Sequence, residues 1–149
     1  MYSGTLCAFV WRVGTMTKRA EKPRITLLYC RQCVRGDAEL RIKLQQDSEF
    51  DLRAEVLPCS SKVRVSQLLK ILEPGVDALE LVGCPVESCR LLVGSRRAEQ
   101  RVAYARGLLA EAGVDPERIG MSRGMDLSAD DLLVFVRKRA AAMSERKDT

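Results

Sequence analysis

Five cysteines are the best candidates for chemistry in this sequence, because each of them closely follows an apolar run of strand length. Cys30 and Cys33 follow Ile25 to Tyr29, Cys59 follows Val56-Leu57-Pro58, and Cys84 and Cys89 follow Leu79 to Gly83. Thiolates bind zinc or iron–sulfur clusters, and paired thiols can exchange disulfides. The sequence therefore predicts a site built from thiols, close to the ends of several strands.

The types of residue available restrict this chemistry further. The chain has no histidine, so no imidazole can act as a general base, a zinc ligand or a Rieske-type ligand. Two local pairs, Cys30-x-x-Cys33 and Cys84-x4-Cys89, offer the four thiolates that a 2Fe–2S cluster, a 4Fe–4S cluster or tetrahedral zinc requires. Cys59 is a fifth candidate. Cys30-x-x-Cys33 is also compatible with thiol oxidoreductase chemistry, in which the pair cycles through a disulfide.

The elements that position these thiols alternate between strands and helices. We expect strands at residues 25–29, 51–57, 78–83 and 118–122, and helices at 34–46, 65–72, 95–113 and from Ser128 onward. This alternation predicts a small three-layer α/β fold, flavodoxin-like, with a four-stranded parallel sheet. For the strand order 2-1-3-4, the loops after the first three strands are neighbours at the carboxyl edge, and all five thiols surround one crevice.

Length and composition indicate one globular domain. Of the 149 residues, 46% are hydrophobic and 30% are charged. We expect a flexible extension (1–22), an α/β domain (23–142) and a disordered tail (143–149). No apolar run approaches the roughly 20 residues of a membrane span, and the opening residues lack the pattern of a signal peptide. We therefore expect a cytoplasmic protein that is not embedded in a membrane.

The net charge of +5 comes from scattered basic residues without interleaved aromatic side chains, so nucleic-acid binding is not expected. A docking surface for an acidic protein partner fits this pattern better. We expect Arg97 and Arg101, on the helix that follows the last cysteine, to form part of that surface. Arg31, Lys62 and Arg90 are sequence neighbours of the cysteines, and their charge is expected to favour the reduced form of a redox centre.

Several segments together resemble one known family, the delta subunit of methyl-viologen-reducing hydrogenase. They are residues 23–33, Leu57-Pro58-Cys59-Ser60, Val82-Gly83-Cys84 through Cys89-Arg90, the run from Gly94 to Val102, and Gly113 to Arg118. The resemblance implies an electron-transfer subunit with a 2Fe–2S cluster and no substrate of its own. Its implied partners are a hydrogenase or other electron donor and a heterodisulfide-reductase-like flavoprotein.

Within this resemblance, the two local pairs are the favoured ligands. We expect Cys30, Cys33, Cys84 and Cys89 to bind the metal, and Cys59 to lie beside the cluster as a thiol that hydrogen-bonds it or excludes water. Two other functions remain open. One is a zinc-stabilised protein interaction module, and the other is a thiol oxidoreductase that uses Cys30 and Cys33.

Overall fold

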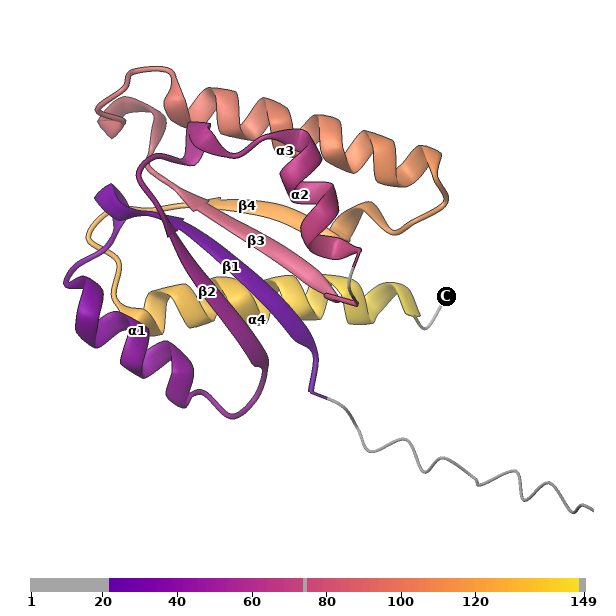
Figure 1. The fold of residues 1–149 in the computed structure, drawn as a ribbon, viewed down its shortest axis with the longest axis horizontal. Helices are drawn as coiled ribbons and strands as arrows, with labels where there is room; N and C mark the ends of the chain where they lie inside the picture. The colour runs from indigo at the N-terminus through magenta and orange to yellow at the C-terminus, as the bar shows by residue number, and fades with distance from the viewer. Residues whose placement is uncertain (1–21, 74, 148–149) are drawn as a thin grey trace, which may run out of the picture.

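Four parallel strands form one sheet in the order β2-β1-β3-β4, as the sequence predicts (Figure 1). The computed structural model describes residues 22–73 and 75–147, so all but the last residue of the expected N-terminal extension lies outside the described residues. The strands are β1 (Arg24–Cys30), β2 (Asp51–Leu57), β3 (Ala78–Gly83) and β4 (Ile119–Arg123).

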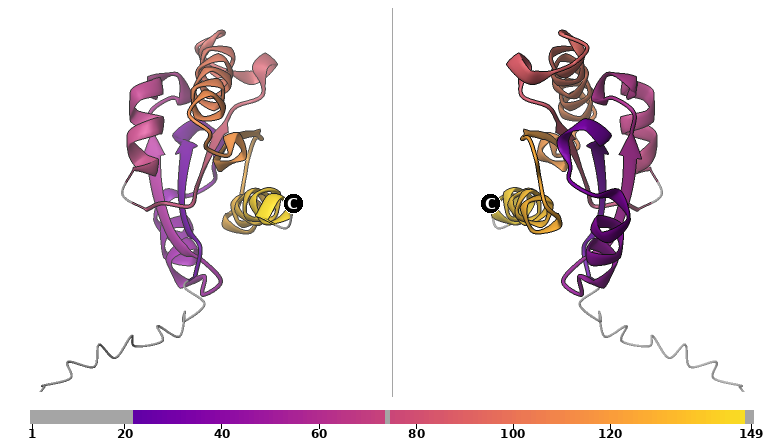
Figure 2. Two further views of the ribbon diagram at one scale, coloured as in Figure 1. Left: turned by 90° about the vertical axis from the view of Figure 1, so that its right-hand side faces the viewer. Right: turned by 90° about the vertical axis from the view of Figure 1, so that its left-hand side faces the viewer.

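Four helices cover the two faces of the sheet and make a three-layer α/β fold. They are α1 (Asp37–Gln46), α2 (Val65–Leu72), α3 (Gly94–Glu111) and α4 (Ala129–Lys147). Two separate clusters of buried side chains divide the helices between the faces: α1 and α4 pack on one face of the sheet, and α2 and α3 on the other (Figures 1 and 2). None of the described helices is long and apolar enough to cross a membrane.

Local sequence signals explain most of the helix ends. Ser128 precedes α4, and its backbone N–H and hydroxyl both donate to Asp131 Oδ2, while the N–H of Asp131 donates back to Ser128 Oγ. This reciprocal arrangement is a capping box, and it fixes the helix start. Beyond α3, Gly113 has φ +73, the left-handed conformation expected of a glycine that terminates a helix.

The first helix begins later than expected. We predicted a helix from residue 34, but α1 starts at Asp37. Val34 instead forms a parallel bridge with Leu127, and the N–H of Arg35 donates to the carbonyl of Leu127. Gly36 then adopts φ +60, which separates this extended segment from the helix. A contact with the distant segment before α4 therefore overrides the local helical pattern.

The last helix is longer than expected. It continues to Lys147, so residues 143–147 are helical, whereas we predicted a disordered tail from residue 143. Arg137 and Arg139 consequently lie in the middle of α4. Arg137 pairs with Asp47 and Glu49 after α1.

Arg139 makes a buried ion pair that the sequence analysis missed. Its Nε lies 2.6 Å from Oε2 of Glu80, a carboxylate in the middle of β3 that is only 1% exposed. Ser122 donates to the other carboxylate oxygen of Glu80, and Arg139 also pairs with Glu117, which in turn pairs with Arg106. The network ties α4, β3 and the end of α3 together.

Candidate thiol site

The register of the strands brings the cysteine loops together at the carboxyl edge of the sheet, on the left of Figure 1. In this register Tyr29 of β1 lies opposite Val82 of β3, so the chain leaves both strands at the same level. On the other side, Cys30 lies opposite Leu57 of β2, two residues before Cys59. The predicted convergence of the thiols on one edge is therefore confirmed.

Three thiols form a tight buried cluster. Cys33 Sγ lies 3.3 Å from Cys84 Sγ, and Cys84 Sγ lies 3.9 Å from Cys30 Sγ. All three sulfurs lie within 4.8 Å of one another, a spacing at which they could hold a metal ion. The single 3-10 turn Arg31–Cys33 returns the chain on itself, which is why Cys30 and Cys33 share one site although both are attached to the end of β1.

The remaining two thiols lie beside Gly94, the first residue of α3. A Cβ atom added at Gly94 would lie 3.0 Å from Cys59 Sγ and 3.2 Å from Cys89 Sγ. Both sulfurs therefore approach the same point of the backbone, and only glycine leaves them this space. All five cysteines are buried and unpaired by disulfides, and Cys89 packs in the same buried cluster as the trio.

The trio stabilises negative charge at one sulfur. The hydrogen bond from Cys33 lowers the pKa of Cys30 to about 5, with help from the backbone N–H groups of Gln32 and Ser60 and against the effect of burial. The same bond, together with burial, raises the pKa of Cys33 far above its ordinary value. Burial is also the largest cause that raises the pKa of Cys84 to about 11. A thiolate at Cys30 is thus flanked by two thiols, which would release their protons on binding a metal.

Hydrogen bonds outside the thiols fix the backbone that carries them. Ser95, which is fully buried, donates from its hydroxyl to the carbonyl of Cys84 at 2.6 Å. The N–H of Leu127 donates to the carbonyl of Cys33 at 2.8 Å and closes the site next to α4. Gly94 and Ser95 begin one of the segments that resemble the family, but the sequence analysis gave them no role at the site, and it did not single out Leu127. Only Gly94, as a glycine five residues after a cysteine, gave a signal that could have been used.

One arginine expected on a docking surface instead holds the loop after Cys59. Arg101 is half-buried, and its Nη1 donates to the carbonyl oxygens of Ser61 and Val63, the latter at 2.9 Å. The expectation that Arg101 is an exposed docking charge is therefore wrong. Arg97, one turn earlier on α3, is exposed as predicted.

Replacement of Arg101 by leucine is expected to loosen the turn after Cys59. The two bonds from a charged donor stabilise this turn, and each is worth about 1.5–3 kcal/mol before solvent exposure weakens it. The amides of Lys62 and Val63, which donate to Cys59 and Ser60, should then exchange their hydrogens about tenfold faster or more. Arg97→Leu is the matched control and should leave these rates unchanged. Equal protection in both variants would show that Arg101 does not hold the turn.

The cations named from the sequence surround the site without entering it. Arg31, Lys62 and Arg90 are all exposed, while the cysteines beside them are buried. Their charge can act on the thiol site only at a distance and through partial solvent screening.

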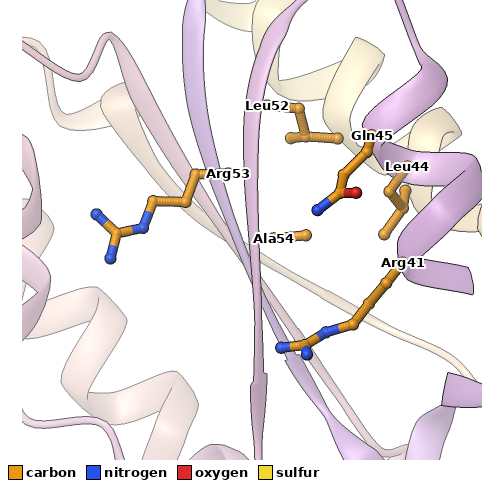
Figure 3. A pocket seen from close by; sticks show the side chains of 6 residues that line it. All are labelled: Arg41, Leu44, Gln45, Leu52, Arg53 and Ala54. Atoms are coloured by element: carbon orange, nitrogen blue, oxygen red, sulfur yellow. The ribbon is translucent and has the colours of Figure 1, made fainter. Parts of the chain in front are cut away.

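A separate hollow of about 340 Å³ lies between α1 and β2. Arg41, Leu44 and Gln45 from α1 face Leu52 and Ala54 of β2, with Arg53 completing the lining (Figure 3). The lining contains no cysteine and no carboxylate. This hollow is therefore not part of the thiol site, and nothing in its lining indicates chemistry of its own.

The fold and the site together define a class of protein: a small parallel α/β domain with a buried cysteine cluster at the carboxyl edge of its sheet. The family can be stated more narrowly. Residues 25–144 match the family model of the methyl-viologen-reducing hydrogenase delta subunit, and the chain belongs to that family. The match confirms the resemblance seen in the sequence.

Individual relatives agree with this assignment. The chain is 29% identical over 123 residues to the vhu iron-sulfur subunit of the F420-non-reducing hydrogenase of Methanocaldococcus jannaschii, covering 83% of this chain and 92% of that protein. It is 26% identical over 98 residues to the iron-sulfur subunit of the F420-non-reducing hydrogenase of Archaeoglobus profundus, covering 66% and 72%.

A different kind of relative is much longer than this chain. It is a subunit of the ferredoxin:CoB-CoM heterodisulfide reductase of Methanosarcina mazei, and it is 23% identical over 101 residues, which are 68% of this chain but only 13% of that protein. A segment of that large protein is therefore similar to most of this chain.

Proposed function

We propose that this protein is an electron-transfer subunit that binds a 2Fe–2S cluster at its thiol site. The observation that carries the proposal is the buried trio of Cys30, Cys33 and Cys84, whose sulfurs lie within 4.8 Å of one another. The donor set fits the cluster, because it consists of soft thiolates only and the chain has no histidine to replace them. A bound cluster would supply storage for single electrons, and the protein would contribute its binding and its shielding from water.

We assign Cys89 as the fourth ligand and Cys59 as a thiol beside the cluster. Cys89 packs in the same buried cluster as Cys30, Cys33 and Cys84, whereas Cys59 does not. In addition, the sulfur of Cys59 already accepts a hydrogen bond from Ser61 Oγ at 3.3 Å. A thiol that has its own partner and stands next to Gly94 is well placed to exclude water from the cluster.

The proposed electron donor is a hydrogenase or another donor module, and the proposed acceptor is a heterodisulfide-reductase-like flavoprotein. The relatives from Methanocaldococcus jannaschii and Archaeoglobus profundus are named as iron-sulfur subunits of a hydrogenase. The relative from Methanosarcina mazei, named as part of a heterodisulfide reductase, contains a segment similar to this chain. In that relative, the similar segment and the rest of the reductase form one polypeptide. A separate chain of the same kind is then expected to bind a protein that resembles the rest of the reductase, which supports the proposed acceptor.

Gly94→Ala is expected to weaken cluster binding without unfolding the protein. The added methyl group would press on the sulfurs of Cys59 and Cys89 at 3.0 and 3.2 Å, so both thiols must move by a few tenths of an ångström. Displacement of groups around a metal site typically costs on the order of 10-fold or more in affinity. Iron retention during dilution into a chelator measures the effect.

Gly107→Ala is the matched control on the same helix. A Cβ atom at Gly107 meets nothing within 4 Å, so this change should raise helix stability by about 0.5–1 kcal/mol and leave iron retention unaltered. Equal iron retention in the two variants would mean that the contacts of Gly94 do not matter for the site.

Anaerobic purification tests the proposed cofactor. We expect iron and acid-labile sulfide in equal amounts, visible charge-transfer absorption, and a paramagnetic signal after reduction by one electron. Colourless protein with zinc would favour the interaction module instead. Metal-free protein with a reversible disulfide between Cys30 and Cys33 would favour a thiol oxidoreductase. Mixing the reduced protein with the flavoprotein then tests the relay, because the flavin should be reduced as the cluster is oxidised.

A further inference from the structure

Three consecutive large apolar side chains are exposed next to the thiol site. Leu91, Leu92 and Val93 are 55%, 81% and 45% exposed, and Leu92 is the most exposed large apolar side chain among the described residues. They follow Cys89-Arg90 and directly precede the start of α3 at Gly94. Figure 2 shows the connection between β3 and α3, which includes this segment, standing out beside α3. We call residues 90–93 the leucine loop.

The leucine loop is held in place at both of its ends. The N–H of Leu92 donates to the carbonyl of Cys89 at 2.9 Å, and the N–H of Arg97 donates to the carbonyl of Val93 at 2.9 Å. Leu92 itself has φ +51, a left-handed conformation that L residues other than asparagine and aspartate rarely adopt. The loop therefore presents the side chain of Leu92 to solvent in a fixed conformation. Most of this side chain stays exposed in the folded domain, so its burial contributes little to stability.

The loop also lies next to two of the buried thiols, those of Cys59 and Cys89. The Cβ atom of Leu91 is 3.6 Å from the point where a Cβ at Gly94 would lie, and the sulfurs of Cys59 and Cys89 surround that same point. A protein that covered the loop would therefore lie close to the thiols of Cys59 and Cys89. Short separation is what rapid transfer of an electron between two proteins requires.

Positive charge borders the apolar side chains. Arg90, Arg96 and Arg97 are all exposed. Within residues 22–73 and 75–147, neither Arg90 nor Arg97 makes an ion pair. An apolar centre with a charged rim is the usual composition of a docking surface, and the sign of this rim selects a partner surface with carboxylates around an apolar hollow.

We propose that the leucine loop, with Arg90 and Arg97, is the surface that docks the heterodisulfide-reductase-like flavoprotein. The inference rests on the proposed function, because it assumes that this flavoprotein accepts the electron. The heterodisulfide reductase relative that contains a similar segment supports this choice of partner over the donor. Leu92 would fill an apolar hollow of the flavoprotein, and the arginines would steer the approach and fix the orientation.

Leu92→Asn provides the sharpest test. Asparagine tolerates the left-handed conformation, so the loop keeps its backbone while it loses the apolar side chain. Binding of the cluster-loaded protein to the purified flavoprotein of the same organism should weaken on the order of 10- to 100-fold, as expected for the loss of one buried leucine. Val134→Gln removes a comparably exposed apolar side chain, 57% exposed on α4, and should not change binding.

Arg97→Glu tests the rim. We expect a slower association at low salt and a smaller difference from the native protein at high salt, whereas Arg41→Glu on α1 should associate like the native protein. If Leu92→Asn and Arg97→Glu both bind the flavoprotein as the native protein does, the proposed docking surface is wrong, while the proposed electron transfer to the flavoprotein still stands. Loss of the cluster in Leu92→Asn would also overturn it, since the loop would then serve the cofactor. Failure of the native protein to bind the flavoprotein would instead refute the proposed function.

Discussion

Cys33→Ser is expected to empty the cluster site, whereas Cys59→Ser is expected to keep the cluster. Cys33 is fully buried within the trio, 3.3 Å from Cys84, so its loss removes one of the thiolates proposed to hold the cluster. Cys59 lies beside Gly94 and has Ser61 as its own partner. Loss of a group beside a metal site should shift its potential or lower its affinity about 10- to 100-fold without abolishing binding.

Iron content and the paramagnetic signal after reduction, both measured anaerobically, decide between these outcomes. Cys89→Ser should behave like Cys33→Ser, because we assign Cys89 as the fourth ligand. Cys7→Ser is the control, since Cys7 falls in the predicted N-terminal extension, outside the described residues, and no role is assigned to it. The assignment of the ligands is wrong if Cys59→Ser empties the site while Cys89→Ser retains the cluster.

Arg139→Met is expected to destabilise the whole domain. The carboxylate of Glu80 is 1% exposed and would lose its cationic partner, and an unpaired buried charge costs about 3–5 kcal/mol. Urea unfolding should therefore show a large loss in the free energy of unfolding. Lys138→Met, at the exposed neighbouring position on α4, should leave it nearly unchanged.

The double variant Glu80→Leu with Arg139→Met separates the buried charge from simple loss of packing. It should recover much of the stability, because an apolar pair of similar size needs no compensation. If the free energy of unfolding of the double variant is as low as that of Arg139→Met alone, the guanidinium stabilises the domain by packing. Gly120 makes room for that guanidinium, since a Cβ there would overlap it.

The burial of Glu80 should also make the free energy of unfolding depend on pH. Burial raises the pKa of Glu80, although Arg139 and the hydrogen bond from Ser122 partly oppose this effect. The folded protein therefore holds the proton of Glu80 more tightly than the unfolded chain does. The contribution of Glu80 to stability is greatest below the pKa that this residue has in the unfolded chain. This contribution is lost as the pH rises through the pKa of Glu80 in the folded protein. Without Arg139 the pKa should rise further, so Arg139→Met should lose more stability between mildly acidic and neutral pH than the native protein does.

The sequence by itself determined the order of the elements and the edge at which the thiols meet. Apolar runs such as Leu79 to Gly83 mark strands buried on both faces, and a strand followed by a helix directs its loop to the carboxyl edge. Glycine at position 113 and Ser128 before α4 mark helix ends, because their effects on the backbone are local. These signals extend over a few residues, which is why they could be interpreted without a structure.

Only the tertiary structure decided which side chains meet within that arrangement. Cys33 and Cys84 are 51 residues apart in the sequence, and the local pattern does not indicate that their sulfurs lie 3.3 Å apart in the fold. Arg97 and Arg101 look alike on one helix, yet Arg101 bonds the turn after Cys59 and Arg97 faces solvent. Such partners depend on where distant segments pack and which rotamers the packing allows, and no spacing along the chain encodes that choice.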